Sequence, residues 1–149
     1  MVVIEIQAPD LQRLYQDWDR RRRGREFPAR SDFDPLDLRY ILGSLSLIDV
    51  LRDPPRFRIR LHATNVVDRA GMDLTGRFID EMPEERRKTA AAHYERVIAE
   101  RAPVARLYEH RPIDERMWNC EILVLPLASD GATIDMLMSA FVWNAESGS

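Results

Sequence analysis

Side chains with catalytic or metal-binding chemistry are few in this 149-residue sequence, and they stand far apart. No two of the three histidines share a short metal-binding spacing such as His-x-x-x-His; they are His62, His93 and His110. No serine stands in a Gly-x-Ser-x-Gly motif, and the six glycines form no phosphate-binding loop. No nucleophile has an evident base beside it. We therefore expect no catalytic residues and no tightly bound metal.

The cysteine and the adjacent carboxylates have ordinary structural explanations. Cys120 is the only cysteine, which excludes an internal disulfide, and a lone cysteine within a strand is usually a buried thiol. The pairs 80–81 and 114–115 fall in a loop and a turn, where carboxylates are usually solvated.

A basic run at residues 20–23, extended by Arg25, could contact phosphates or an acidic membrane surface. Nearby carboxylates offset it, namely Asp10, Asp17, Asp19 and Glu26. The formal net charge is -3, and no aromatic residues alternate with the arginines as they do in single-strand binders. A solvated helix end is the better interpretation, so we expect neither nucleic acid nor membrane as a partner.

Composition favours one domain with a continuous core, because 45% of the residues are hydrophobic and apolar clusters recur throughout. No apolar run approaches the roughly 20 residues that cross a bilayer. The first ten residues, MVVIEIQAPD, do not form a secretory signal. With a single cysteine, these features favour a cytoplasmic protein. Residues 144–149 are expected to form a flexible tail.

The N-terminal 44 residues predict two helices. Asp10 can cap the first, over 10–23, whose apolar residues share one face and are Leu11, Leu14, Tyr15 and Trp18; Gly24 can end it. The second covers 31–43, with Asp34 as cap, Pro35 in the first position and Gly43 as its end. The apolar stripe of the first helix must be buried, either on its own sheet or against the same helix of a second chain. We expect a homodimer that uses this stripe.

The rest of the chain alternates strand and helix signals. Strands are predicted over 45–52, 56–61, 103–113, 116–127 and 132–143, with short helical turns over 63–71 and a longer helix from Pro83 to Arg101. Turn residues between the runs predict antiparallel hairpins. The fold class is therefore α+β, a five-stranded antiparallel sheet with helices mainly on one face. We expect an N-terminal helical segment over 1–44 and the sheet-containing domain over 45–143.

Several segments, in matching order and spacing, carry a resemblance to a known family. They are Trp18, FPARSDFDPLDLRYILGSLSLIDV at 27–50, RFRIRLHAT at 56–64, GMDLTGRFIDEM at 71–82 and EILVLPLASDG at 121–131. The chain resembles PAS domains, in particular a bacterial stand-alone variant with one or two N-terminal helices. Ala63 stands where that variant has glycine, and its β-carbon is expected to narrow the backbone approach or shift the first short helix. The resemblance implies a sensory or protein-interaction role without fixing a ligand.

Two residues touch on cofactors known from PAS domains. In haem sensors of this type an axial histidine comes from the helix that here contains His93, but we interpret His93 as a partly exposed helix residue. Flavin-binding light sensors have a reactive cysteine on a short helix, whereas Cys120 falls on a strand. The cofactor therefore stays unknown.

A polar set within the apolar half of the sequence is the candidate ligand pocket. Its members lie on elements that would flank the PAS cavity: Asn65, Tyr94, Tyr108, Trp118 and Asn119. The alternative is a filled core in which Tyr and Asn satisfy backbone groups.

Three functions remain open at this point. The first is an interaction module that regulates an unknown signalling partner by docking or dimer rearrangement, without catalysis. The second is a sensor with a small-molecule ligand or cofactor in its pocket. The third is a small α+β isomerase-like enzyme, which the apolar inward strand positions disfavour.

Overall fold

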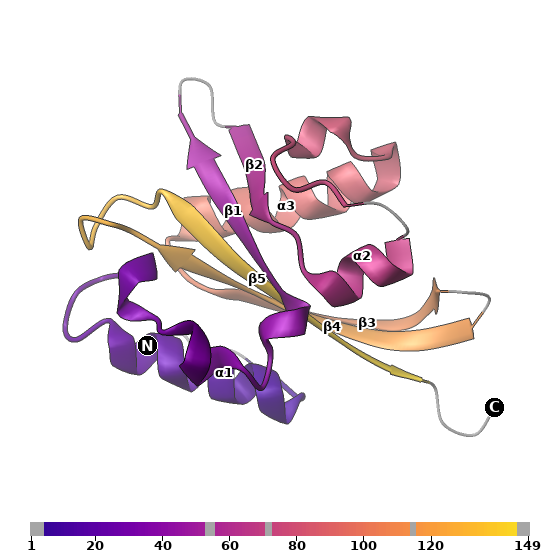
Figure 1. Cartoon of the computed structure of the whole chain (residues 1–149), viewed down its shortest axis with the longest axis horizontal. Helices are drawn as coiled ribbons and strands as arrows, with labels where there is room; N and C mark the ends of the chain where they lie inside the picture. The colour runs from indigo at the N-terminus through magenta and orange to yellow at the C-terminus, as the bar shows by residue number, and fades with distance from the viewer. Residues whose placement is uncertain (1–4, 53–55, 71–72, 114–115, 146–149) are drawn as a thin grey trace.

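A computed structural model describes residues 5–52, 56–70, 73–113 and 116–145, without the side chains of 69–70, 109–113, 116–119 and 144–145. The strands are β1 (Leu45–Leu51), β2 (Arg56–Leu61), β3 (Val104–Ile113), β4 (Arg116–Leu127) and β5 (Met136–Ala145). They form one sheet in the order β2-β1-β5-β4-β3, and every neighbouring pair is antiparallel (Figure 1). The predicted five-stranded antiparallel α+β fold is confirmed.

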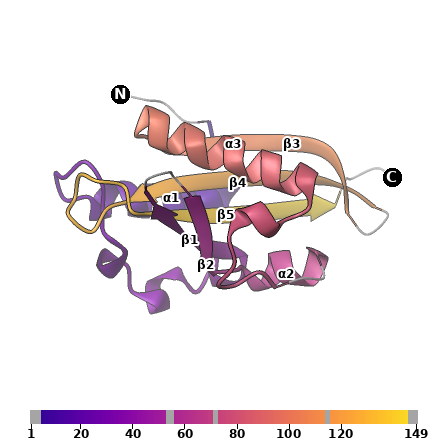
Figure 2. The ribbon, with the colours of Figure 1, turned by 90° about the horizontal axis from the view of Figure 1, so that it is seen from above.

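The helices lie on both sides of this sheet. The first, α1 (Pro9–Arg21), is on one side, while α2 (Thr64–Ala70) and α3 (Glu84–Glu100) are on the other (Figure 1). The α3 helix lies over β3 and β4 (Figure 2). The helices between β2 and β3 thus share one face, as predicted, and the N-terminal helix covers the opposite face.

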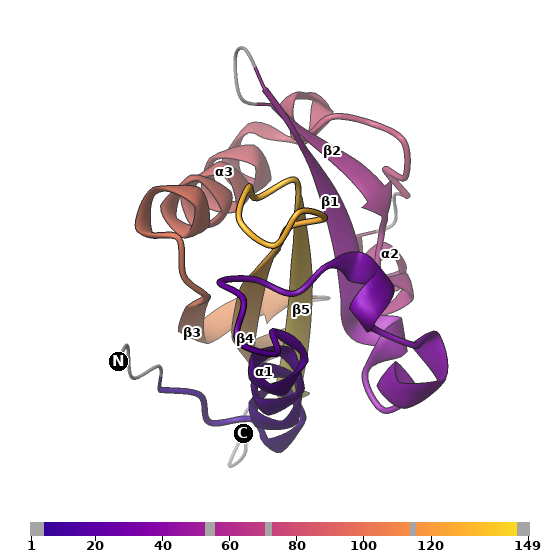
Figure 3. The same cartoon turned by 90° about the vertical axis from the view of Figure 1, so that its left-hand side faces the viewer.

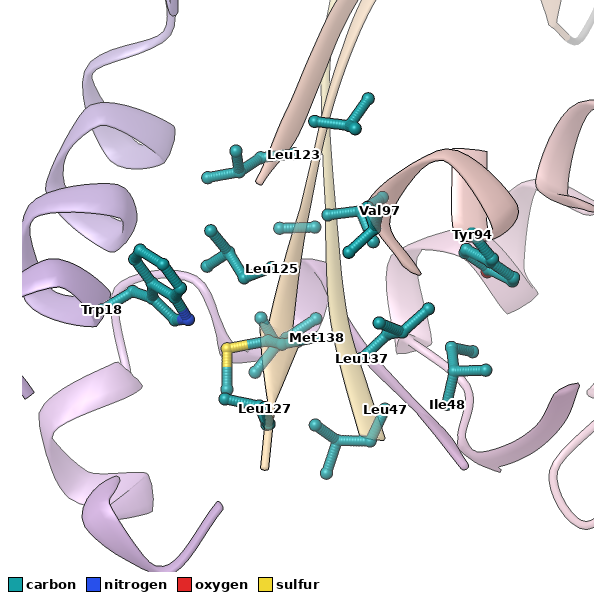
Figure 4. Packing of buried hydrophobic residues seen from close by; sticks show 14 of the residues in the cluster. Trp18, Leu47, Ile48, Tyr94, Val97, Leu123, Leu125, Leu127, Leu137 and Met138 are labelled. Atoms are coloured by element: carbon teal, nitrogen blue, oxygen red, sulfur yellow. The ribbon is translucent and has the colours of Figure 1, made fainter. Parts of the chain in front are cut away.

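The apolar stripe of α1 is buried against its own sheet. Leu11 and Leu14 have no exposed surface and Trp18 has 4%. Figure 4 shows Trp18 facing the side chains that β4 directs toward α1, among them Leu123, Leu125 and Leu127. Burial of each such side chain stabilises the fold by about 1.5–3 kcal/mol, which compensates for the low intrinsic stability of a short helix.

Two hydrogen bonds fix where α1 lies on β4. The indole N–H of Trp18 donates to the carbonyl of Pro126 at 2.8 Å. At the start of the helix, the buried Glu121 carboxylate accepts the backbone N–H groups of Gln7 at 2.8 Å and Ala8 at 2.6 Å. A carboxylate there satisfies free amides and opposes the positive end of the helix dipole.

The second predicted N-terminal helix, over 31–43, is wrong. The structure has three short 3₁₀ turns instead, η1 (Arg30–Asp32), η2 (Pro35–Leu38) and η3 (Leu42–Ser44). Asp34 does cap η2 by accepting the N–H of Leu36, but its own backbone is extended because it precedes Pro35. A helix cannot continue through that residue. Figure 3 shows this segment leading from α1 past the β4–β5 loop to β1.

Boundaries of α1 and β5 also differ from their predictions. Ala8 and not Asp10 is the N-cap of α1, since Pro9 takes the first helical position. The helix ends at Arg21, two residues before the predicted end at Arg23, although Gly24 has the predicted left-handed backbone with φ +83°. Strand β5 begins at Met136 and not at 132, because the Asp130 carboxylate accepts the N–H groups of residues 132 and 133 and holds them in a turn.

Candidate functional site

The layer between α3 and the sheet contains one predicted pocket residue in a packed core. Tyr94 is 5% exposed, and its ring lies 5.3 Å from that of Phe57 in an edge-to-face arrangement. Figure 4 shows Tyr94 and Val97 on the same side of the sheet as Leu137 and Ile48. Burial raises the pKa of Tyr94 to about 12, and the nearby Ser139 hydroxyl opposes this shift. The phenol therefore stays neutral at physiological pH.

A second predicted pocket residue joins α3 to β3. The hydroxyl of Tyr108 and Nε2 of His93 lie 2.6 Å apart and share a hydrogen bond, with ring centroids 5.8 Å apart. His93 is 6% exposed, so its interpretation as a partly exposed residue is wrong. The neighbours 93 and 94 are both buried because α3 contacts β3 and β4 as well as η4 (Ile79–Glu81).

The strand register extends this pair across the sheet. Tyr108 of β3 is opposite Cys120 of β4, which is opposite Trp143 of β5. Directly opposed residues of antiparallel strands point to the same face, so this row lies on the face that α3 covers. Cys120 is a buried thiol, as expected, and the ring of Trp143 stacks on that of Phe141 with centroids 5.4 Å apart.

Asn65 is not part of this buried row. It is exposed on α2, and its side-chain N–H donates to the Ser44 hydroxyl at 2.8 Å. A β-carbon on Gly43 would lie 3.3 Å from the same amide nitrogen, so glycine allows the close approach. Asn65 therefore connects α2 to η3 at the surface.

Trp118 and Asn119 have only their backbones described. Both lie in β4, where Trp118 pairs with Arg111 and Ala145, and Asn119 pairs with residue 144. Their side chains lie outside the described part of the chain, so their place in a pocket stays a prediction.

His62 is an internal hydrogen-bond acceptor, a role that the sequence did not indicate. It is 8% exposed, and its Nδ1 accepts the N–H of Leu74 at 3.1 Å. Burial and the positive charge of Arg86 lower the pKa of His62, while Asp73 opposes them. The neutral ring therefore holds the segment after α2 in place through its hydrogen bond with Leu74.

Carboxylates neutralise much of the basic run that ends α1. Arg20 and Arg21 both pair with Asp17, and Arg22 pairs with Asp19. Further along, Arg25 pairs with Asp32 at 2.6 Å. These contacts agree with a solvated, internally compensated helix end. Glu26, expected to offset the run, instead pairs with Arg101.

A groove runs along the outer edge of β3, and no pattern in the sequence predicted it. Its volume is about 500 Å³, and residues 103–107 form its floor. Its walls contain Arg96 and Glu100 of α3 on one side and Glu5 and Gln7 of the N-terminal segment on the other. A single sequence does not show which strand is at an edge, so this surface could not be predicted.

Within the described ranges, no three His, Cys, Asp or Glu side chains come together as a metal site. The same residues include no helix that is both long enough and apolar enough to span a bilayer.

The sheet order, the helices between β2 and β3 and the buried row beneath α3 define a PAS-type α+β fold. The family model described as PAS domain matches residues 6–141. The chain belongs to the PAS domain family. A crystal structure of a sensory box sensor histidine kinase from Vibrio cholerae is similar in fold, with 17% identity and a TM-score of 0.53. That match covers 76% of this chain and 93% of the other. No curated protein matches.

Proposed function

We propose that this chain is a cytoplasmic PAS sensory module that transmits a signal by contact with another protein and has no catalytic activity. Membership of the PAS family supports the sensory role. We also propose the division into an N-terminal segment over 1–44, a PAS domain over 45–143 and a tail over 144–149.

The buried apolar core beneath α3 is the observation that favours protein contact over a bound ligand. Val97 and Leu137 have no exposed surface, Ile48 has 1% and Tyr94 has 5%. Apolar side chains at native packing density leave little room for a small molecule between them. The module can thus fold around its own side chains.

A ligand sensor is the second candidate, and the row of Tyr108, Cys120 and Trp143 beneath His93 favours it. Binding sites are mostly apolar with a few converging polar groups, and this row has that character. A ligand here would contact the Tyr108 hydroxyl.

Native mass spectrometry and an absorption spectrum of the purified protein distinguish the two candidates. We expect masses equal to 17.4 kDa or its multiples and no absorbance beyond that of the aromatic residues. A stoichiometric added mass or a chromophore would refute the ligand-free module. Loss of that mass in Tyr108→Phe would assign the ligand to the row beneath His93.

The apolar stripe of α1, which we expected at a dimer interface, packs within its own chain. Leu11, Leu14 and Trp18 are buried in their own chain, and Tyr15 is half-buried with its ring 6.0 Å from that of Trp18. A dimer built on this stripe would require α1 to leave its sheet. We retain the homodimer as a proposal and look for its interface elsewhere.

A further inference from the structure

One edge of the sheet is covered by the chain itself. Beside β2, the N–H of Ile59 donates to the carbonyl of Arg77 at 2.8 Å, and the N–H of Gly76 donates to the carbonyl of Ile59 at 2.6 Å. Arg58 and Phe78 form an antiparallel bridge at the same place. Residues 76–78 thus occupy backbone positions that another strand would need.

The opposite edge is open within the described chain. Strand β3 is the last strand of the sheet, and no described segment pairs with its outer side. The groove of about 500 Å³ exposes this edge over residues 103–107. An uncovered edge presents free backbone N–H and C=O groups, which favours pairing with another strand.

Proline and a bulge limit the open edge to a short run. Pro103 precedes β3 and has no N–H to donate, and Pro112 interrupts its far end. The pairing of β3 with β4 shifts register between Tyr108 and Arg111. The regular run is therefore 104–108, of which 104–107 line the groove, and this allows one short, defined pairing.

We propose that a second copy of this chain docks on the edge, so that the two β3 strands pair antiparallel about a two-fold axis at Ala105. This inference rests on the proposed role in protein contact and names the surface. Residues 76–78 cover the outer side of β2, so β3 of one copy cannot pair with β2 of another in a head-to-tail arrangement. The remaining edge-to-edge contact is β3 with β3, which closes as a dimer.

Strand geometry determines the register. A two-fold axis normal to the sheet keeps each face on its own side, so each residue is opposite one of the same face. For the pairing to stay within residues 104–107, the part of the regular run that lines the groove, the axis can pass through Ala105 or Arg106. At Arg106 two guanidinium groups would be opposed, which is destabilising. At Ala105 two methyl groups meet, and Val104 is opposite Arg106 of the second copy.

The charges of the α3 wall suit a second copy. The α3 wall has Arg96 and Glu100, 3.2 Å apart and both about half exposed. A two-fold axis reverses the order of such a pair, so opposite charges can face each other between the copies.

Cysteine cross-linking of the full chain tests the register. Directly opposed Cβ atoms lie about 4.5–5.5 Å apart, close to disulfide geometry, whereas diagonal neighbours are about 7–8 Å apart. We expect Ala105→Cys to form a disulfide-linked dimer at least about tenfold faster than Arg106→Cys, the matched control. Both variants retain the buried Cys120. Equal rates, or faster linkage through residue 106, would overturn the proposed register.

Charge reversal tests the interface without a cysteine. We expect Arg96→Glu to weaken the dimer at least about fivefold by sedimentation, because both copies then present acidic walls. Lys88→Glu is the control, since Lys88 forms an equivalent i,i+4 pair with Glu84 on the same helix outside the groove. Equal effects of the two changes would contradict the proposal.

The two proposals fail in different ways. A monomer mass of 17.4 kDa at about 100 µM, a concentration that would reveal weak pairing, would refute docking at β3. The proposal that the module contacts a different protein would still stand. A stoichiometric small molecule in the native mass would refute the ligand-free module, whatever the cross-linking result.

Discussion

The hydroxyl groups of Tyr108 and Tyr40 differ in their partners. That of Tyr108 shares a hydrogen bond with buried His93, whereas that of Tyr40 is buried without a partner among the described residues. We expect Tyr108→Phe to lower the free energy of unfolding by about 1–2 kcal/mol, because it leaves a buried imidazole nitrogen without this bond.

Tyr40→Phe is the matched control, and its expected effect is close to zero or stabilising, since it removes a buried hydroxyl that makes no bond. Urea unfolding of the two variants measures the difference. Equal losses of stability would show that the bond between residues 93 and 108 contributes nothing.

His62 links stability to pH. Burial lowers the pKa of His62 in the folded state, so between the folded pKa and the unfolded value of about 6.5 the unfolded chain binds more protons. The stability that neutral His62 contributes to the folded state is therefore fully present above about pH 6.5. It is lost as the pH falls through the folded pKa. Protonation would also remove the acceptor of the Leu74 N–H.

The unfolded pKa of about 6.5 sets the range to test, roughly pH 7 to 5.5. Over this range we expect the free energy of unfolding to fall more steeply with decreasing pH in the wild type than in His62→Gln. Urea titrations at several pH values give both slopes. A variant that retains the full slope would assign the pH dependence to other groups.

At the scale of elements, Glu121 connects the start of α1 to β4, the strand next to the β3 edge of the sheet. Its two oxygens accept the N–H groups of Gln7 and Ala8, which an amide cannot reproduce because one oxygen becomes an NH₂ donor. We expect Glu121→Gln to cost about 1–3 kcal/mol and to speed hydrogen exchange in the first turn of α1. Glu95→Gln on the exposed side of α3 is the control. Unchanged exchange in α1 would contradict this role.

At the scale of the molecule, α1 closes an apolar face that would otherwise be open to water. Leu14→Asp places a charge where Leu14 has no exposed surface, so we expect α1 to separate from the sheet. The exposed β4 side chains should then bind an apolar fluorescent dye, while the far-UV signal of the sheet remains. Gln16→Asp, on the exposed side of α1, should bind no dye. Dye binding by both variants would contradict the docking.

Local patterns predicted the elements well. The alternation of apolar and arginine residues from Arg56 to Leu61 gave β2 with its observed bounds, and β4 was likewise predicted over 116–127. Both are determined by neighbours in sequence. The error at 31–43 has a local cause as well, since Pro35 constrains Asp34 to an extended backbone.

The site depended on contacts that a single sequence does not contain. His93 is buried because β3 supplies Tyr108 fifteen residues later, and Asn65 is exposed because its partner, Ser44, lies on η3. The β3 edge became visible once the order of strands was known. The predicted positions of Trp118 and Asn119 in a pocket stay untested.

The bond from Trp18 to Pro126 gives the molecule a natural spectroscopic probe. Pairing of β3 with β4 ends at Val124, so Pro126 lies past the end of β3, and its carbonyl accepts the indole N–H of α1. That indole proton should give a distinct NMR resonance when α1 is docked. The position of the helix can therefore be followed in the unlabelled protein, during any change of pH, concentration or partner.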